Sequence, residues 1–451
     1  MNNNSIHDLG RRQFIRKSST VMAGLSVVPS YVVSGLGYKA PSDKLNIAVI
    51  GIGGKGKSLV TQAANENLVA LCDVDWNVTV EEVFNTYKQA KRYKDYRLML
   101  DRQKEIDAVM IATPDHTHAV ISMEAIKRNK HVYTEKPLTR TILESRKLTE
   151  AARKYKVSTQ MGNQHQADES SRRLREMIWD GVIGDVHEVH IWTDRPNRKF
   201  LGTYWPQGIS RPKDILPIPE SLDWDLFIGP APKRPYHSAY HPFNWRGWLD
   251  FGTGALGDIG CHRFDPVFRA LKLKYPTSVE AASTIINDET YPQGSVVYYK
   301  FPAREDMPPL TLIWYDGGLR PPVLSELENG DTMGYGGTLF IGSKGKILGN
   351  KIYPKKLREE YTPPEPSIPS SPGHFEEWVN ACKGGESAGS NFEWAGPLTE
   401  TVLLGNIALQ PELKEGISST PLQFDSEKFC FPNFPEADKF LHYTYREGWH
   451  L

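Results

Sequence analysis

Two short motifs carry side chains that could together oxidise an alcohol. Lys136 lies in the run Glu135-Lys136-Pro137, and Asp258 and His262 stand four residues apart farther along the chain. Removing a hydride from a carbinol carbon requires a base near the hydroxyl proton, and a histidine that titrates near the operating pH suits that role. Lys136 would stabilise the developing alkoxide, while Asp258 would orient the imidazole or make a second proton contact. The alternative is a structural histidine and a salt bridge at a strand end.

A glycine turn is the second feature with chemical meaning. The pattern GxGxxG is matched by Gly51-Ile52-Gly53-Gly54-Lys55-Gly56. In a dinucleotide-binding fold such glycines permit a tight turn and let the backbone approach a pyrophosphate at a helix N-terminus. Asp73 follows at about the 20-residue spacing of the acid that binds ribose hydroxyls. A carboxylate there repels a 2′-phosphate, so we expect NAD rather than NADP, although Lys55 could partly offset the repulsion.

The same turn also satisfies the pattern GxxxxGK[ST], because Lys57 and Ser58 follow Gly56. A phosphate-binding loop of a nucleoside triphosphatase is therefore a literal match, with Asp73 as its metal-holding acid. The compact interval between strand and acid, together with the motifs elsewhere, favours the dinucleotide. A glycine turn without a ligand is the third alternative.

The elements that must position these residues alternate regularly from residue 45 onward. The sequence predicts strands at 45–50, 68–72, 108–111, 131–133 and 157–160, and helices at 57–65, 118–128 and 143–155. This alternation is typical of a parallel, doubly wound sheet, so the fold class is α/β and residues 44–162 are expected to form a Rossmann domain. Such sheets place ligands at the carboxyl ends of their strands, which here lead into residues 112–118 and 134–138.

The second half has a different texture. Extended runs at 186–193, 279–286, 295–301 and 310–315 accompany helices near 170–180, 265–273, 374–382 and 398–409. A segment rich in proline and aromatic residues, 194–245, shows little periodicity. Residues 163–425 therefore predict an α+β domain with a largely antiparallel sheet. Residues 426–451 form a C-terminal tail.

Several polar and aromatic residues of the second half are candidates for substrate contacts. They are Asn163, Gln164, His165, Trp245, Arg246 and His262. Aromatic faces against sugar C–H groups, with polar groups for the hydroxyls, suit a carbohydrate, and the lack of a basic cluster disfavours a phosphorylated sugar. The aromatic residues of 205–248 could equally pin a long loop to the domain or to a neighbouring subunit.

The first 40 residues indicate export. Arg11 and Arg12 precede a weakly apolar stretch of small residues, as in a twin-arginine signal, so we expect a periplasmic protein cleaved between Ser34 and Ser42. A basic helix that ends at Pro29 is the alternative. Twin-arginine export carries folded proteins, often with a cofactor bound.

Composition excludes several classes of protein. The 451 residues include 54 Lys and Arg against 54 Asp and Glu, so bulk binding of nucleic acid is not expected. No apolar run is long enough to span a bilayer. The four cysteines lie far apart, and neither His237 with His241 nor His116 with His118 makes a convincing metal site, so we expect none.

Taken together, the glycine turn, Glu135-Lys136-Pro137 and the pair Asp258 and His262 resemble the Gfo/Idh/MocA oxidoreductases over residues 45–410. The resemblance implies a Rossmann domain, a second domain with an open sheet, and a homo-oligomer, dimer or tetramer. It also implies that Lys136 contacts substrate and nicotinamide ribose and that Asp258 and His262 flank the reacting carbinol. The cofactor would lie along Thr113, Pro114, His118 and Glu135. Asp115 stands where relatives often have asparagine, and its role stays open.

The expected function is an NAD(P)-dependent oxidoreductase that moves a hydride between a sugar or glycoside carbinol and a tightly bound nicotinamide cofactor. A redox-neutral NAD-dependent glycosidase, lyase or epimerase on the same scaffold is the main alternative. A P-loop nucleoside triphosphatase and a non-catalytic sugar-binding relative are the others.

Overall fold

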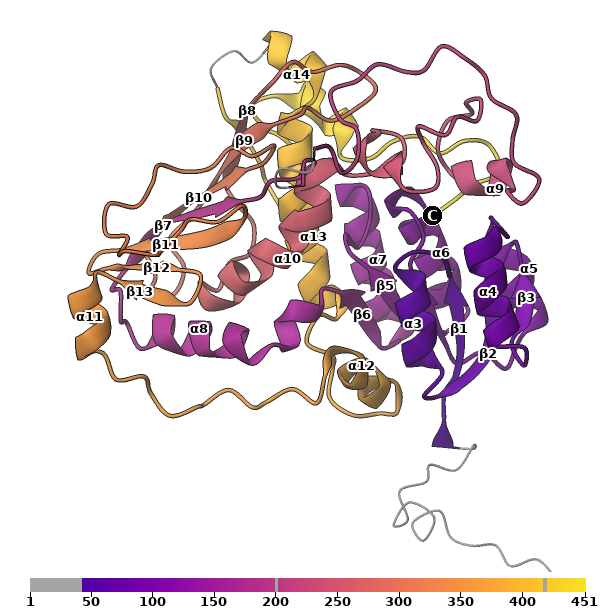
Figure 1. Ribbon diagram of the computed structural model, residues 1–451, viewed down its shortest axis with the longest axis horizontal. Coiled ribbons are helices and arrows are strands. Elements are labelled where there is room, and N and C mark those ends of the chain that lie inside the picture. The colour runs from indigo at the N-terminus through magenta and orange to yellow at the C-terminus, as the bar shows by residue number, and fades with distance from the viewer. Residues whose placement is uncertain (1–42, 199–201, 417–419) are drawn as a thin grey trace, which may run out of the picture. The chain divides into compact units, whose positions relative to one another are not determined.

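Six parallel strands form the first sheet of the computed structural model, which describes residues 43–198, 202–416 and 420–451 (Figure 1). The strands are β1 (Asn46–Ile50), β2 (Asn67–Cys72), β3 (Lys91–Tyr93), β4 (Ala108–Ile111), β5 (His131–Glu135) and β6 (Thr159–Gly162). Their order, β3-β2-β1-β4-β5-β6, is that of a Rossmann domain. Strand order reverses beside β1, so a ligand crevice is expected where β1 and β4 end. The predicted signal segment 1–40 lies outside the described residues.

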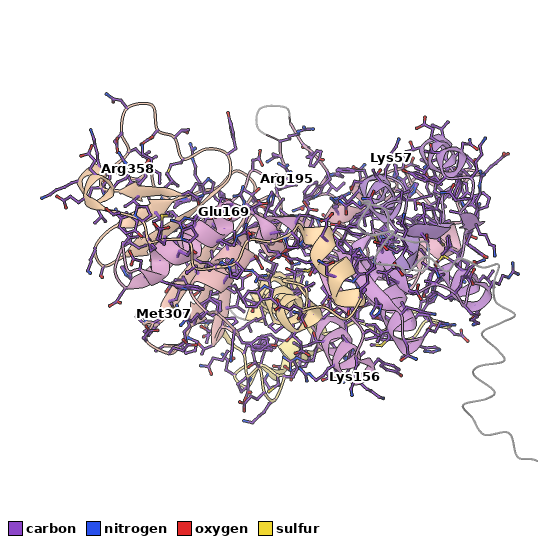
Figure 2. The ribbon with its side chains drawn as sticks, turned by 90° about the horizontal axis from the view of Figure 1, so that it is seen from below. Lys57, Lys156, Glu169, Arg195, Met307 and Arg358 are labelled. Carbon is purple, nitrogen blue, oxygen red and sulfur yellow. The ribbon has the colours of Figure 1, made fainter. Side chains whose placement is uncertain are left out.

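The helices of this domain explain why the strands are so apolar. They are α3 (Gly56–Ala63), α4 (Val78–Thr86), α5 (Tyr96–Arg102), α6 (Asp115–Lys127) and α7 (Ile142–Tyr155). A parallel sheet covered on both faces buries consecutive residues, and β4 is buried throughout. Thr141 and Glu144 form a capping box that starts α7, and Lys156, labelled in Figure 2, ends it with a φ of 54°.

The sequence did not predict α4, α5 or β3. Asn77 caps α4 by accepting hydrogen bonds from the backbone N–H groups of Thr79 and Val80, and Asp95 caps α5 in the same way. Strand β3 has three residues, two of them exposed, at the edge of the sheet. An edge strand this short gives no periodic signal in the sequence.

The second sheet has eight strands in the order β13-β12-β11-β7-β10-β9-β8-β14. They are β7 (Val186–Trp192), β8 (Ser278–Ser283), β9 (Ser295–Phe301), β10 (Leu310–Tyr315), β11 (Gly337–Gly342), β12 (Lys346–Leu348), β13 (Lys351–Tyr353) and β14 (Leu422–Gln423). Strands β7 and β10 pair in parallel, and the other pairs are antiparallel, which confirms a mixed, mostly antiparallel sheet.

Helices and short turns complete the second half. They are η2 (Gln164–Ala167), α8 (Glu169–Trp179), α9 (Trp224–Ile228), η3 (Asn244–Gly247), α10 (Gly254–Ala270), α11 (Lys355–Glu360), α12 (His374–Cys382), α13 (Phe392–Ala408), α14 (Pro411–Gly416) and η4 (Pro435–Phe440). Phe264 of α10 packs on Tyr299 and Trp314 of the sheet, at ring-centroid distances of 5.5 and 6.0 Å. Among the residues described, no helix has the length and apolar character needed to cross a membrane.

Helix α10 corrects a prediction, because it begins at Gly254 and not near residue 265. Glycines lower helix propensity, so the sequence did not predict the first turns of this helix. They are needed for close packing, since a Cβ on Gly260 would lie 2.8 Å from Cγ1 of Val402 on α13. The early start places Asp258 and His262 within the helix.

Residues 222–251, which include the end of the segment 194–245, have an apolar core of their own. Trp224, Tyr236, Tyr240, Trp245 and Trp248 are buried there with neighbouring aliphatic residues. The tail 426–451 runs back over the first domain, where the N–H of Leu143 donates to the carbonyl of Leu441 at 2.9 Å. Both segments therefore contribute to the surroundings of the crevice.

Candidate active site

A cavity of about 640 Å³ lies at the carboxyl ends of β1, β4 and β5, where α10 and the segment 195–246 close over it. The predicted residues that line it are Gly51, Gly53, Gly54, Lys55, Asp73, Thr113, Pro114, His118, Glu135, Lys136, Gln164, Trp245, Arg246, Asp258 and His262. Its volume is in the range of pockets that hold cofactors and other small molecules. One cavity thus brings together residues separated by about 200 positions in the chain.

Four predicted residues do not line the cavity. Ile52 and Gly56 are buried under the turn, and Asn163 is 1% exposed. His165 lies outside the lining, but its ring meets that of His262 edge to face at a centroid distance of 5.7 Å. Ile52, Gly56 and Asn163 thus lie beneath the lining, whereas the His165 side chain is exposed to solvent.

The glycines of the turn divide into two roles. A Cβ on Gly51 would lie 2.7 Å from the carbonyl carbon of Ala112, and one on Gly56 would lie 1.7 Å from the carbonyl oxygen of Gly51. These two glycines allow β1, β4 and α3 to pack. A Cβ on Gly53 would meet only Val80, at 3.8 Å, and one on Gly54 would meet nothing within 4 Å. Gly53 and Gly54 therefore leave open space in front of α3, as a pyrophosphate requires.

Asp73 holds the turn from the end of β2. Its Oδ2 accepts hydrogen bonds from the N–H groups of Ile52 at 2.8 Å and Gly53 at 3.3 Å, and its Oδ1 accepts one from Asp75 at 3.0 Å. Burial raises the pKa of Asp73 although these donors lower it. The sequence suggested that Lys55 could partly offset the charge of Asp73. In the structure, Lys55 Nζ instead lies 3.9 Å from Oε1 of Glu135.

Lys136 and Asp258 form an ion pair across the cavity. Lys136 Nζ lies 2.8 Å from Asp258 Oδ1 and 2.5 Å from the Asp258 carbonyl oxygen, while Arg246 Nε lies 3.5 Å from the same Oδ1. Burial by itself would raise the pKa of Asp258, but Lys136 and Arg246 hold that pKa below its ordinary value. Asp258 is therefore a carboxylate bound to Lys136. The expected role of orienting the His262 imidazole is not what the structure shows for it.

His262 is a neutral base in these surroundings. Burial, followed by the charge of Lys136, lowers the pKa of His262 to about 3, so the expected titration near neutral pH is wrong. Its Nδ1 is buried and has no hydrogen-bond partner among the residues that the structure describes. Buried polar atoms without partners are rare in folded proteins, and the half-buried His262 ring lines the cavity.

Two further carboxyl groups at the cavity have pKa values raised to about 7. Burial raises the pKa of Glu135 to about 7 against the opposing charges of Lys55 and Lys136, and Gln164 donates to Glu135 at 3.1 Å. Burial likewise raises the pKa of Asp115 to about 7, and Thr253 donates to it at 2.6 Å. Carboxyl groups with a shifted pKa beside a cation are common in active sites. The role of Asp115, which the sequence left open, is therefore that of a buried carboxyl group at the cavity.

His118 braces the cavity wall. Its two ring nitrogens each lie 2.8 Å from a backbone carbonyl oxygen, one of Pro137 and one of Thr113. Burial lowers the pKa of His118 to about 4. The imidazole therefore ties the loop after β4 to the loop after β5, and it lines the cavity between them.

The aromatic residues of the long segment mostly serve packing. Phe243, Trp245 and Tyr204 reach the cavity, whereas Trp205, Trp224, Tyr236, Tyr240 and Trp248 are buried away from it. His237 lies 3.3 Å from Asp214 and His241 lies 3.4 Å from Asp75. Within the described ranges no cluster of ligands could hold a metal ion.

Sequence reasoning missed several lining residues. They include Tyr96, Arg195, Tyr204 and Trp449. Arg195, labelled in Figure 2, stacks on Tyr204 at 4.9 Å from the ring centroid and pairs with Asp194. Trp449 comes from the tail, and no local motif marks it.

Two family models match the chain and together cover more than half of it. They are the Gfo/Idh/MocA models "Oxidoreductase family, NAD-binding Rossmann fold" over residues 45–163 and "Oxidoreductase family, C-terminal alpha/beta domain" over residues 169–301. The chain therefore belongs to the Gfo/Idh/MocA family of oxidoreductases. The glycine turn is thus part of an NAD-binding Rossmann domain, and the interpretation as a triphosphatase loop is wrong.

Curated relatives match part of the chain. An alpha-N-acetylgalactosaminidase of Shewanella oneidensis is 27% identical over 237 residues, which are 44% of this chain and 51% of the relative. An inositol 2-dehydrogenase of Salmonella typhimurium is 29% identical over 151 residues, 32% of this chain and 45% of the relative. The chain spans about half the length of the curated relatives it matches.

Solved structures share the fold over most of the chain. The WlbA dehydrogenase of Bordetella pertussis, in complex with NADH and UDP-GlcNAcA, superposes with a TM-score of 0.56 at 16% identity, over 82% of this chain and 97% of that one. GenD2 from gentamicin A biosynthesis, in complex with NAD, gives a TM-score of 0.56 at 17% identity, over 85% and 97%. At these identities the likeness concerns the fold alone.

Proposed function

We propose that this protein moves a hydride between a carbinol of a sugar or glycoside and a tightly bound NAD cofactor. The observation that carries the proposal is the meeting of Lys136 and a neutral, unpartnered His262 in one cavity with the glycine turn. Each is a group that alcohol oxidation needs, and Arg246 and Trp245 offer polar and apolar contacts to a sugar beside them.

The residues present fit a nicotinamide dinucleotide. Gly53 and Gly54 leave room for a pyrophosphate at the start of α3, and Asp73 stands where the ribose of the adenosine half is held. Asp73, Asp75 and Asp95 all line this end of the cavity, and Lys55 lies away from Asp73 beside Glu135. A 2′-phosphate would meet carboxylates there, which supports NAD over NADP. Binding constants for both dinucleotides, compared between the wild type and Asp73→Ser, test this preference.

The chemistry follows from the charges. When bound, the nicotinamide ring supplies the acceptor for a hydride that leaves the carbinol carbon with its C–H electron pair. His262, neutral at physiological pH, takes the hydroxyl proton at its imidazole. Lys136 is held by Asp258 at 2.8 Å and stabilises the negative charge that grows on the oxygen.

The experiment is a screen of mono- and disaccharides for reduction of the cofactor, followed by absorbance. Wild type is compared with His262→Asn, and the exposed Lys57→Met serves as a matched surface control. Turnover in the wild type and in Lys57→Met, with loss in His262→Asn, supports the proposal. Equal turnover in all three would contradict it.

A redox-neutral reaction is the second candidate. Two observations favour it: the alpha-N-acetylgalactosaminidase relative, and the carboxyls of Glu135 and Asp115 held near pKa 7 beside Lys136. A simple dehydrogenase needs one base, whereas elimination or epimerisation after transient oxidation needs a further group that exchanges a proton. Accumulation of NADH during turnover would decide for net oxidation, and product release without NADH would decide for the redox-neutral cycle.

We also propose that the protein is exported to the periplasm with its cofactor bound. Support comes from the twin-arginine motif at Arg11 and Arg12. A periplasmic dehydrogenase has no pool of NAD to draw on, so a retained cofactor must be regenerated in place. Fractionation of cells that express the full chain, with Arg11→Lys/Arg12→Lys as control, tests the location. NAD in the supernatant of the denatured, dialysed protein tests retention.

A further inference from the structure

The C-terminal tail is tied to the first domain and to the segment around α9 by specific contacts. Tyr445 donates from its hydroxyl to Glu144 of α7 at 2.6 Å. The N–H of Arg446 donates to the carbonyl of Pro230 at 3.0 Å, its Nε donates to the carbonyl of Gly229 at 2.8 Å, and its guanidinium pairs with Asp225 at 2.5 Å. Four donor groups of one short stretch are thereby fixed, so the tail has one defined path over the domain.

That path brings Trp449 into the lining of the cofactor cavity. Its side chain is 8% exposed. The guanidinium of Arg97 lies 4.7 Å from the centroid of its ring, and the Tyr96 ring lies at 6.5 Å. Arg97 in turn makes a bidentate ion pair with Asp95, which also lines the cavity. The indole is thus held by residues that follow β3 and by its own tail.

The position of Trp449 marks the adenosine end of the cavity. Tyr96 and Asp95 come just after β3, the strand next to β2 and Asp73. A Cβ on Gly229 would lie 2.9 Å from Thr117 and 3.8 Å from Cη2 of Trp449, so the indole lies near the first turn of α6. Lys136 and His262 belong to the other end, where the reaction takes place.

We infer that Trp449 and the tail that anchors it form a wall of the adenosine subsite and set the rate at which the dinucleotide leaves. The inference rests on the proposed function, because it concerns the same cofactor. A flat indole in a pocket of this kind offers a surface on which an adenine base can stack. Arg446 is a positioning residue, which acts by holding Trp449 in place.

The experiment measures release of the reduced cofactor and not turnover. Full-length protein loaded with NADH is mixed with excess NAD, and the loss of bound NADH fluorescence gives the dissociation rate. The variants are Trp449→Ala, Trp449→Phe and Arg446→Ala. Trp179→Ala is the matched control, since Trp179 is 45% exposed on α8 and lines no part of the cavity.

Loss of one aromatic stacking contact corresponds to about a tenfold faster release, because such a contact contributes on the order of 1.4 kcal/mol. We expect this in Trp449→Ala, a smaller effect in Trp449→Phe, faster release in Arg446→Ala and no change in Trp179→Ala. Thermal unfolding of each variant shows whether it is folded. If Trp449→Ala does not fold, the release rate of Trp449→Phe is the test.

Release from Trp449→Phe and Arg446→Ala at the wild-type rate would overturn the inference while leaving the proposed function intact. A wild-type protein that binds no nicotinamide dinucleotide would instead refute the proposed function, and the role of Trp449 with it. Faster release in Trp179→Ala as well would show a general loosening and also contradict the inference.

Discussion

Lys136 and Asp258 belong to different domains, yet Lys136 Nζ lies 2.8 Å from Asp258 Oδ1 and 2.5 Å from the Asp258 carbonyl oxygen. The side chains are 16% and 15% exposed. The pair thus connects the end of β5 to helix α10 at the point where the substrate carbinol is proposed to lie. Its structural role and its proposed chemical role can be separated by mutation.

Lys136→Met should lower kcat by about 10²–10³-fold, because the charge that stabilises the alkoxide is lost. It should also lower the free energy of unfolding by about 2–4 kcal/mol, because Asp258 keeps a buried charge without its closest cation. Lys136→Met/Asp258→Asn should recover most of the stability and none of the rate. Denaturant unfolding and steady-state kinetics measure the two effects, and a double variant that recovers the rate would contradict the assignment.

The value of kcat/KM should not fall as the pH drops through 6.5, the pKa of an ordinary histidine. The pKa of His262 is lowered to about 3, so the imidazole stays neutral throughout the range from pH 5 to 8. The profile of kcat/KM against pH should therefore lack an acid limb near 6.5. Any inflection near 7 should disappear in Glu135→Gln or Asp115→Asn. A limb near 6.5 that persists in both variants and vanishes in His262→Asn would show that the pKa is not lowered.

Glu135→Gln should change how stability depends on pH. The pKa of Glu135 is raised to about 7 in the folded protein, above its ordinary value of 4.5, so the folded state binds the proton more tightly than the unfolded state. The stabilisation is complete below about pH 4.5 and is lost as the pH rises through 7. The wild type should lose on the order of 3 kcal/mol relative to Glu135→Gln over this range. Parallel curves of unfolding free energy against pH would contradict the raised pKa.

Two glycine variants should separate folding from cofactor binding. Gly56→Ala places a Cβ 1.7 Å from the carbonyl oxygen of Gly51, so it should destabilise the protein by about 3 kcal/mol or more. Gly53→Ala meets no protein atom closer than 3.8 Å and should keep the wild-type melting temperature. Its methyl group would occupy the space left for the pyrophosphate and should weaken NAD binding at least tenfold, as calorimetry can measure. Unchanged NAD affinity in Gly53→Ala would place the pyrophosphate elsewhere.

The sequence was informative where a signal is local. Strands β1, β2 and β4 contain continuous apolar runs, and the alternation of strands with helices predicted the Rossmann domain. The spacing of four residues from Asp258 to His262 is compatible with one helix face, and both residues lie on α10. The helix start at Gly254 was missed, because Gly257 and Gly260 are there for close contacts that no propensity scale reflects.

The site was less predictable because burial and partners come from distant parts of the chain. The depressed pKa of His262 depends on Lys136, and the partner of Asp258 is that lysine and not the neighbouring imidazole. Trp449 reaches the cavity through contacts of Arg446 with residues more than 200 positions earlier. No pattern in residues 426–451 indicates such a contact.

The placement of Trp449 has a consequence for biosynthesis. The glycine turn leaves the ribosome early, and a domain of this size can begin to fold while translation continues. If Trp449 forms a wall of the adenosine subsite as proposed, that side of the subsite stays open until residue 449 has emerged and the tail has contacted Gly229 and Asp225. A dinucleotide bound earlier would be held without this wall, and if the protein is exported folded, the wall must form before the chain reaches the translocase.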